Sequence, residues 1–210
     1  LVSAGRRRIL PSTIYCRRRG TGIGRNRQQT LAEVGAPAGR TTLVLGGAAS
    51  GKSTYAESLV LQLSGRPVYI ATAQAFDDEM TDKIAVHRDR RGDRWTTIEE
   101  PFDLSAAIAG ADAPDSIILV DCLTLWLSNL MAAERDIDAA TLALTGSIEN
   151  IQGRLVLVAN EVGLGIVPEN AMARSFRNLH GTLNQAVAEA ADRVVFVAAG
   201  LPLALKGGVD

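Results

Sequence analysis

The stretch LVLGGAASGKST, residues 43–54, decides the fold. Its core, GGAASGKS, runs from Gly46 to Ser53 and matches the phosphate-loop pattern G-x-x-x-x-G-K-[ST] in full. A strand-like apolar run precedes the pattern and a helix-like run follows it, which is the context that a phosphate loop requires. Glycines let backbone N–H groups curl around phosphate oxygens, and the following helix directs its positive end at the same anion. We therefore predict a nucleoside triphosphate site.

Two further roles follow from this prediction. We expect Lys52 to reach the β and γ phosphates as a catalytic residue, and the Ser53 hydroxyl to bind Mg²⁺. Asp121 ends the apolar run SIILV, where a buried strand delivers its last side chain to the ligand edge of a sheet. We predict that Asp121 is the carboxylate on the metal side; a strand-end aspartate that caps a turn is the alternative. The nucleotide-binding residues of the loop are Gly46, Gly47, Ala48, Ala49, Ser50, Gly51, Lys52 and Ser53.

The rest of the chain indicates an α/β fold. Apolar runs rich in β-branched residues recur without polar alternation, as in parallel strands that are buried on both faces. Helix-like segments separate them, so that strand and helix alternate throughout. We therefore predict a P-loop NTPase-like, doubly wound, mostly parallel sheet in a single domain, with helices on both faces and right-handed crossovers. The expected strands are 41–47, 66–72, 116–122, 153–160 and 192–200, and the expected helices are 53–65, 77–90, 123–135 and 170–192.

Charge divides the chain into two parts. The formal net charge is −1, but residues 1–40 carry nine Arg and one Glu, a charge of +8, which leaves −9 for the remainder. We interpret residues 1–40 as a basic N-terminal extension and residues 41–210 as the nucleotide-binding domain. A targeting peptide and a nucleic-acid-binding arm are the alternatives for the extension. Because the body is acidic, we expect no nucleic-acid partner.

The cysteines and the hydropathy bear on location. Cys16 and Cys122 have no disulfide or metal-site spacing, so a reducing cytoplasm is the simplest compartment. No uncharged apolar stretch reaches the roughly 18 residues of a membrane span, so we expect none.

His87 is the candidate nucleophile. On a helix, Met80, Ile84 and His87 share one face, and Arg88, Arg90 and Arg91 would form a phosphate clamp beside the imidazole. A neutral imidazole can attack phosphorus and carry the transferred group as a phosphoramidate. A core-facing, hydrogen-bonded histidine is the alternative interpretation, and it is the one that we favour for His180.

Five segments together resemble the family of bifunctional adenosylcobinamide kinase / adenosylcobinamide-phosphate guanylyltransferases. The resemblance covers about residues 41–206. The segments are GGAASGKS (46–53), YIATAQAFDDEM (69–80), KIAVHRDRRGDRW (83–95), LVDCLTLWLSNLM (119–131) and VANEVGLGIVPENAMARSFRNLHGTLNQAVAEAADRVVFVAAG (158–200).

The resemblance implies two reactions that use GTP or ATP with Mg²⁺. One phosphorylates adenosylcobinamide; the other transfers GMP from GTP, through guanylylated His87, to give adenosylcobinamide-GDP and pyrophosphate. It also implies a homo-oligomer, a trimer. By position it assigns nucleotide contacts to Ala71, Thr72, Ala73, Arg88, Asp89, Arg90, Arg91, Glu99 and Asp121.

Three points stay open. Asn160 and Glu161 end a strand at the same edge, and we expect them to orient the acceptor substrate. A plain small-molecule P-loop kinase without a covalent step is the alternative activity. A nucleic-acid or partner-binding module that uses the basic extension is a third hypothesis.

Overall fold

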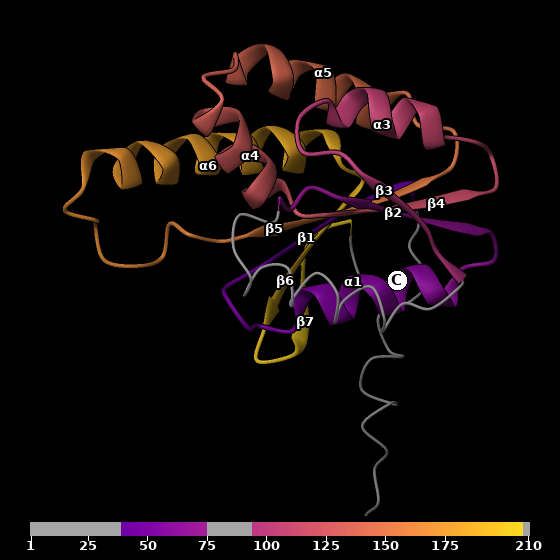
Figure 1. Cartoon of the computed structure of the whole chain (residues 1–210). Helices are drawn as coiled ribbons and strands as arrows, with labels where there is room; N and C mark the ends of the chain where they lie inside the picture. The colour runs from indigo at the N-terminus through magenta and orange to yellow at the C-terminus, as the bar shows by residue number, and fades with distance from the viewer. Residues whose placement is uncertain (1–38, 75–93, 208–210) are drawn as a thin grey trace, which may run out of the picture.

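The computed structural model describes residues 39–74 and 94–207, and these form one α/β unit around a seven-stranded sheet (Figure 1). The strand order is β3-β2-β4-β5-β1-β6-β7. The strands are β1 (Thr41–Gly46), β2 (Arg66–Ala71), β3 (Thr96–Glu99), β4 (Ser116–Asp121), β5 (Arg154–Asn160), β6 (Arg193–Ala198) and β7 (Leu201–Lys206). The helices are α1 (Lys52–Gln62), α3 (Leu104–Ala111), α4 (Leu123–Ala132), α5 (Ile137–Glu149) and α6 (Ala171–Ala190).

The sheet confirms the predicted fold class. All neighbouring strands pair in parallel except β6 and β7, which pair antiparallel. The five expected strands are present with bounds that differ by one or two residues, and their continuous apolar runs are buried on both faces. The expected helix 77–90 lies outside the described residues.

Strict alternation of strand and helix is the part of the prediction that is wrong. Strand β6 turns directly into β7, and α4 is followed by α5 with no strand between them. Sequence analysis also missed β3, β7, α3 and α5. Strand β3 is short and mostly exposed, and the leucines of β7 are exposed, so neither strand carries the continuous apolar signal of a buried strand.

Helices cover both faces of the sheet, as predicted. Figure 1 shows α1 on one face and α3, α4, α5 and α6 on the other. Because successive strand side chains point to opposite faces, each strand feeds two cores. In β1, Leu43 and Leu45 join the core under α3–α6, whereas Val44 joins the core under α1.

The carboxyl ends of the parallel strands lie along one edge of the sheet. Gly46 at the end of β1 pairs with Asn160 at the end of β5, and Asp121 at the end of β4 pairs with Val158. At the opposite edge, the exposed carboxylate of Asp192 accepts bonds from the N–H groups of Arg40 and Thr41 and from the Thr41 hydroxyl, at 2.8–2.9 Å. Hydrogen bonds at the edge of the amino ends thus hold the start of β1 in place. The edge of the carboxyl ends is available for ligands.

Candidate nucleotide-binding site

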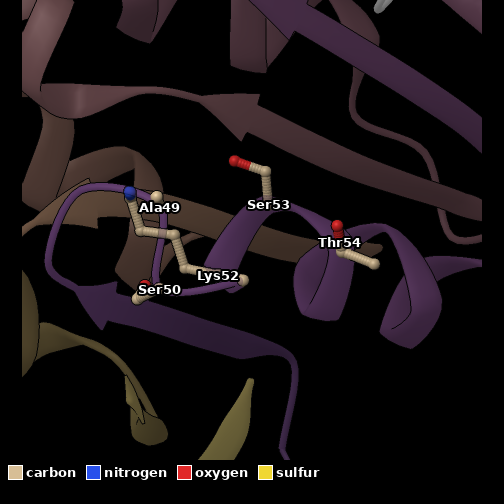
Figure 2. A pocket seen from close by; sticks show the side chains of 6 residues that line it. Ala49, Ser50, Lys52, Ser53 and Thr54 are labelled. Carbon is tan, nitrogen blue, oxygen red and sulfur yellow. The ribbon is translucent and has the colours of Figure 1, made fainter. Parts of the chain in front are cut away.

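The predicted phosphate loop leaves β1 at Gly46 and enters α1 at Lys52. It surrounds an open hollow of about 300 Å³ that is lined by residues 49–54. Lys52 folds back across the loop, and its Nζ donates a hydrogen bond to the Gly47 carbonyl at 3.1 Å (Figure 2). The Ser53 hydroxyl lies in the first turn of α1. Because the N–H groups of a helix's first turn have no partner within the helix, this hollow suits an anion.

Two glycines are required by the loop's geometry. A Cβ on Gly46 would lie 2.5 Å from Ser50 Oγ and 2.6 Å from the Val197 carbonyl oxygen. Gly51 has φ of 93°, a left-handed conformation that only glycine adopts at low cost. The loop is also tied to the β6–β7 turn, because Gly200 N–H donates to the Ser50 carbonyl at 2.8 Å. The loop shape is therefore built into the fold before any ligand binds.

Asp121 lies on the side of the sheet that faces α1. It follows Ile117 and Leu119 at intervals of two residues, and both belong to the core under α1. The Tyr69 hydroxyl donates to Asp121 Oδ2 at 3.1 Å, which holds the carboxylate in place. Since only β5 separates β4 from β1, Asp121 is two strand spacings, about 10 Å, from the phosphate-loop strand. Asp121 and Ser53 therefore share one edge and one face.

The segment 71–73 ends β2 beside Asp121. Ala71 pairs with Asp121 in the sheet, and Thr72 is fully buried. The Thr72 hydroxyl donates to the Cys122 carbonyl at 2.8 Å and accepts from Cys122 N–H at 2.9 Å, while Asn129 Nδ2 donates to the Thr72 carbonyl at 2.8 Å. Thr72 therefore locks the ends of β2 and β4 together, and its nucleotide contact, like those of Ala71 and Ala73, stays a prediction.

Glu99 lies farther along the same edge. It is the last residue of β3, is exposed and pairs with Ala71. Strand β3 is four strand spacings from β1, about 19 Å, so Glu99 is far from the phosphate loop. Its predicted contact with the nucleotide stays a prediction.

A buried hydrogen-bond network fixes the end of β5. Thr124 Oγ1 accepts from Asn160 N–H at 2.8 Å and lies 2.9 Å from His180 Nε2. Asn184 Nδ2 donates to the Asn160 carbonyl at 3.1 Å and lies 3.2 Å from His180 Nδ1. Since the amide nitrogen can only donate, Nδ1 accepts and the proton of the neutral imidazole is on Nε2, donated to Thr124. Burial lowers the pKa of His180, against a smaller opposing effect of Glu161.

Asn160 itself reaches the site, as its place at the end of a strand predicts. Its side chain follows Val156 and Val158, which face α1, so it is directed to the same face as Asp121. Its Oδ1 is buried and has no hydrogen-bond partner among the described residues. The next residue, Glu161, donates its N–H to the Gly46 carbonyl at 3.0 Å. An unpaired buried acceptor beside the phosphate loop suits an N–H or O–H group of a ligand.

Five predicted site residues lie outside the described part of the chain, and their roles stay predictions. They are His87, Arg88, Asp89, Arg90 and Arg91. Sequence analysis missed Tyr69, Thr124 and Asn184, because a single polar residue in an apolar segment does not show which strand end it faces. His180 is fully buried and hydrogen-bonded, in agreement with its structural interpretation.

Comparison with known proteins shows the family to which this chain belongs. The family model of cobinamide kinase / cobinamide phosphate guanyltransferase matches residues 42–205. The chain belongs to this family. It is therefore a transferase with a P-loop nucleotide-binding fold.

Curated relatives and a solved structure agree with this assignment. The bifunctional adenosylcobalamin biosynthesis protein CobP of Pseudomonas aeruginosa is 46% identical over 167 residues, 79% of this chain and 96% of that protein. The bifunctional adenosylcobalamin biosynthesis protein CobU of Salmonella typhimurium is 41% identical over 179 residues, 78% of this chain and 98% of that protein. The flagellar accessory protein FlaH of Methanocaldococcus jannaschii has a TM-score of 0.50 at 14% identity, over 88% of this chain and 86% of that one, which is a likeness of fold. No helix among the described residues has the length and apolar character to cross a membrane.

Proposed function

We propose that the protein phosphorylates adenosylcobinamide with ATP or GTP and then transfers GMP from GTP to the phosphate, through a guanylylated histidine. The observation that carries the proposal is the phosphate loop at the same edge and face as Asp121, in a chain of the cobinamide kinase / cobinamide phosphate guanyltransferase family. The products are adenosylcobinamide-GDP and pyrophosphate, in the assembly of cobalamin.

In the kinase step, the loop and Lys52 hold the triphosphate while the acceptor hydroxyl attacks the γ phosphorus. The bond between γ phosphorus and the bridging oxygen breaks, the nucleoside diphosphate leaves, and the hydroxyl proton passes to water. Lys52 Nζ would exchange its bond to the Gly47 carbonyl for phosphate oxygens, where its charge offsets the developing negative charge. The Asn160 amide oxygen is placed to accept a hydrogen bond from the acceptor hydroxyl or from a bound water.

The donor set fits Mg²⁺. The Ser53 hydroxyl and the Asp121 carboxylate would hold the ion, and Tyr69 keeps the carboxylate oriented. No group of three or more His, Cys, Asp or Glu side chains in the described ranges could hold a metal ion by itself. This suits Mg²⁺, which commonly binds one or two protein ligands and takes the rest from phosphates and water. When bound, the ion would neutralise phosphate charge.

In the second step, we propose His87 as the nucleophile. A neutral imidazole nitrogen attacks the α phosphorus of GTP, and the bond to pyrophosphate breaks. The phosphate oxygen of the acceptor then attacks the same phosphorus and releases the imidazole. Arg88, Asp89, Arg90 and Arg91 would contact the nucleotide phosphates beside it.

Labelling at two positions of GTP tests the proposal. With an α-³²P label we expect protein-bound radioactivity that is acid-labile and base-stable, as a phosphoramidate is, and that is lost in His87→Ala. With a γ-³²P label we expect transfer to adenosylcobinamide in both proteins. If wild type transfers γ phosphate but never acquires α label, the protein is a plain kinase. If His87→Ala keeps full α labelling, the nucleophile is another residue.

Three further parts of the proposal rest on the same resemblance and on composition. They are a homo-oligomer, a trimer; a cytoplasmic location; and a basic extension, residues 1–40, of which the part before Gly39 is dispensable for catalysis. Sedimentation of the full chain checks the first. Activity of a chain that begins at Gly39 checks the last.

A further inference from the structure

An apolar groove lies between α4 and the start of α6. Its volume is about 600 Å³, within the range of small-molecule sites. None of the residues that line it is charged, and Met131 and Phe176 supply its largest side chains. The lining residues are Ser128, Met131, Ala132, Asn170, Met172, Ala173 and Phe176.

The segment that leads into α6 adds exposed apolar side chains. Leu164 is 82% exposed, Ile166 97% and Met172 74%, which are high values for residues of this size. The segment is nevertheless anchored. Arg174 Nη1 donates to the Pro168 carbonyl at 3.0 Å, and the Asn170 side chain caps α6 by accepting from Met172 N–H at 2.8 Å. Hydrogen bonds therefore fix the end of this segment and the first turn of α6, which carries Met172.

Both helices that form the groove follow segments that leave the sheet at the edge that carries the phosphate loop. Helix α4 starts two residues after Asp121, and at 1.5 Å per residue Met131 is about 12 Å along it. The segment before α6 starts at Glu161, which is bonded to Gly46 (3.0 Å). Phe176 packs against His180, with 5.6 Å between ring centroids, and His180 is bonded through Thr124 to Asn160. Figure 1 shows the segment between β5 and α6 extending beyond this edge of the sheet.

Two other hollows in the described part of the chain lie elsewhere. One is lined by residues at the start of β1 and the ends of α5 and α6, and the other by residues around the ends of α3 and α5. Both are at the opposite edge, out of reach of a group that must also touch the phosphates. Of these three hollows, the α4–α6 groove is the one whose helices lead back to the edge that carries the phosphate loop.

We propose that the α4–α6 groove, with Leu164 and Ile166 of the preceding segment, binds the macrocycle of the phosphoryl acceptor. The inference rests on the proposed function, in which the acceptor is a corrinoid. A corrin macrocycle carries methyl groups and uncharged amides on its rim, and these match an uncharged lining of methionine, alanine and phenylalanine with the Ser128 hydroxyl at its side. The arm that ends in the reactive hydroxyl would point along α4 toward the phosphate loop.

Filling the groove tests the inference. Ala132→Trp places an indole in the groove, and Ala139→Trp, at an exposed position of α5 outside it, is the matched control. With the full chain we measure binding of adenosylcobinamide by equilibrium dialysis, KM for adenosylcobinamide and GTP, and oligomeric state by sedimentation. We expect Ala132→Trp to weaken corrinoid binding and raise its KM about 10-fold or more, with KM for GTP and the sedimentation unchanged, and Ala139→Trp to match wild type.

The outcomes are distinguishable. If wild type binds no corrinoid, the proposed function fails. If wild type binds it and Ala132→Trp binds it equally well, the groove assignment is overturned while the function stands. A change of sedimentation in Ala132→Trp with unchanged corrinoid binding also overturns it, in favour of a second copy of the chain in the groove. A second groove variant, Phe176→Leu, guards against misfolding, since it enlarges the groove with a small change of shape and should weaken corrinoid binding alone.

Discussion

Replacing Thr124 by valine is the sharpest test of the buried network behind the site. The valine keeps the shape of the side chain and removes one oxygen, which accepts hydrogen bonds from Asn160 N–H at 2.8 Å and from His180 Nε2–H at 2.9 Å. Both donors are then buried without partners. Each such donor costs about 1–3 kcal/mol, so we expect a loss of about 2–6 kcal/mol of unfolding free energy. That is a large part of the 5–15 kcal/mol typical of a domain.

Urea unfolding of the full chain measures this loss, with Thr182→Val as the matched control. Thr182 is exposed, and its hydroxyl bonds only locally, to the Asn178 carbonyl at 3.2 Å, so we expect a change within about 0.5 kcal/mol. A cycle with His180→Phe separates the two donors. In that background one of them is already gone, so Thr124→Val should cost about 1–3 kcal/mol less than in wild type.

Two results would refute this reasoning. If Thr124→Val is no more destabilising than Thr182→Val, the two donors find other partners and the network does not hold β5. If the costs of Thr124→Val and His180→Phe simply add, the 2.9 Å contact between them carries no coupling.

The remaining predictions concern the same edge. Asn160→Leu removes an amide oxygen that has no hydrogen-bond partner in residues 39–74 and 94–207, so we expect stability within about 1 kcal/mol of wild type but a kcat about 10–100-fold lower. An unchanged kcat would exclude a catalytic role for this oxygen. Burial lowers the pKa of His180 from its ordinary 6.5. Between pH 6.5 and the lower folded pKa, the imidazole is therefore protonated in the unfolded chain and neutral in the native protein. Unfolding free energy should therefore fall as pH drops below 6.5 and level off below the folded pKa, and His180→Phe should lose this part of the pH dependence in urea titrations. Gly46→Ala places a Cβ 2.5 Å from Ser50 Oγ, so it should cost about 1–3 kcal/mol of unfolding free energy and weaken GTP binding in calorimetry. Gly47→Ala is the control: among the described residues no atom lies within 4 Å of its added Cβ, so it should cost under about 1 kcal/mol.

Much of the fold could be predicted because its signals are local. Strands β1, β4 and β5 are buried on both faces, so each reads as an unbroken apolar run whatever its neighbours are. Strands β3 and β7 lie at the two ends of the sheet, where side chains are exposed, and their runs carry no such signal. Helix α5 follows α4 with no strand between them, whereas the prediction assumed that strands and helices alternate.

The sequence by itself determined the phosphate loop and the family, because the chemistry of Gly46–Ser53 is contained in eight consecutive residues and needs only the preceding strand and the following helix. Tertiary structure decided what surrounds the loop. Placing β5 between β1 and β4 puts Asn160 beside Gly46 and sets Asp121 two strands away, and neither fact has a trace in the spacing along the chain. The α4–α6 groove likewise joins Met131 and Phe176, which are 45 positions apart in the sequence. Strand order and helix contacts arise because both faces of one sheet must be buried at once. This requirement involves the whole chain, so strand order and helix contacts cannot be predicted from any short segment.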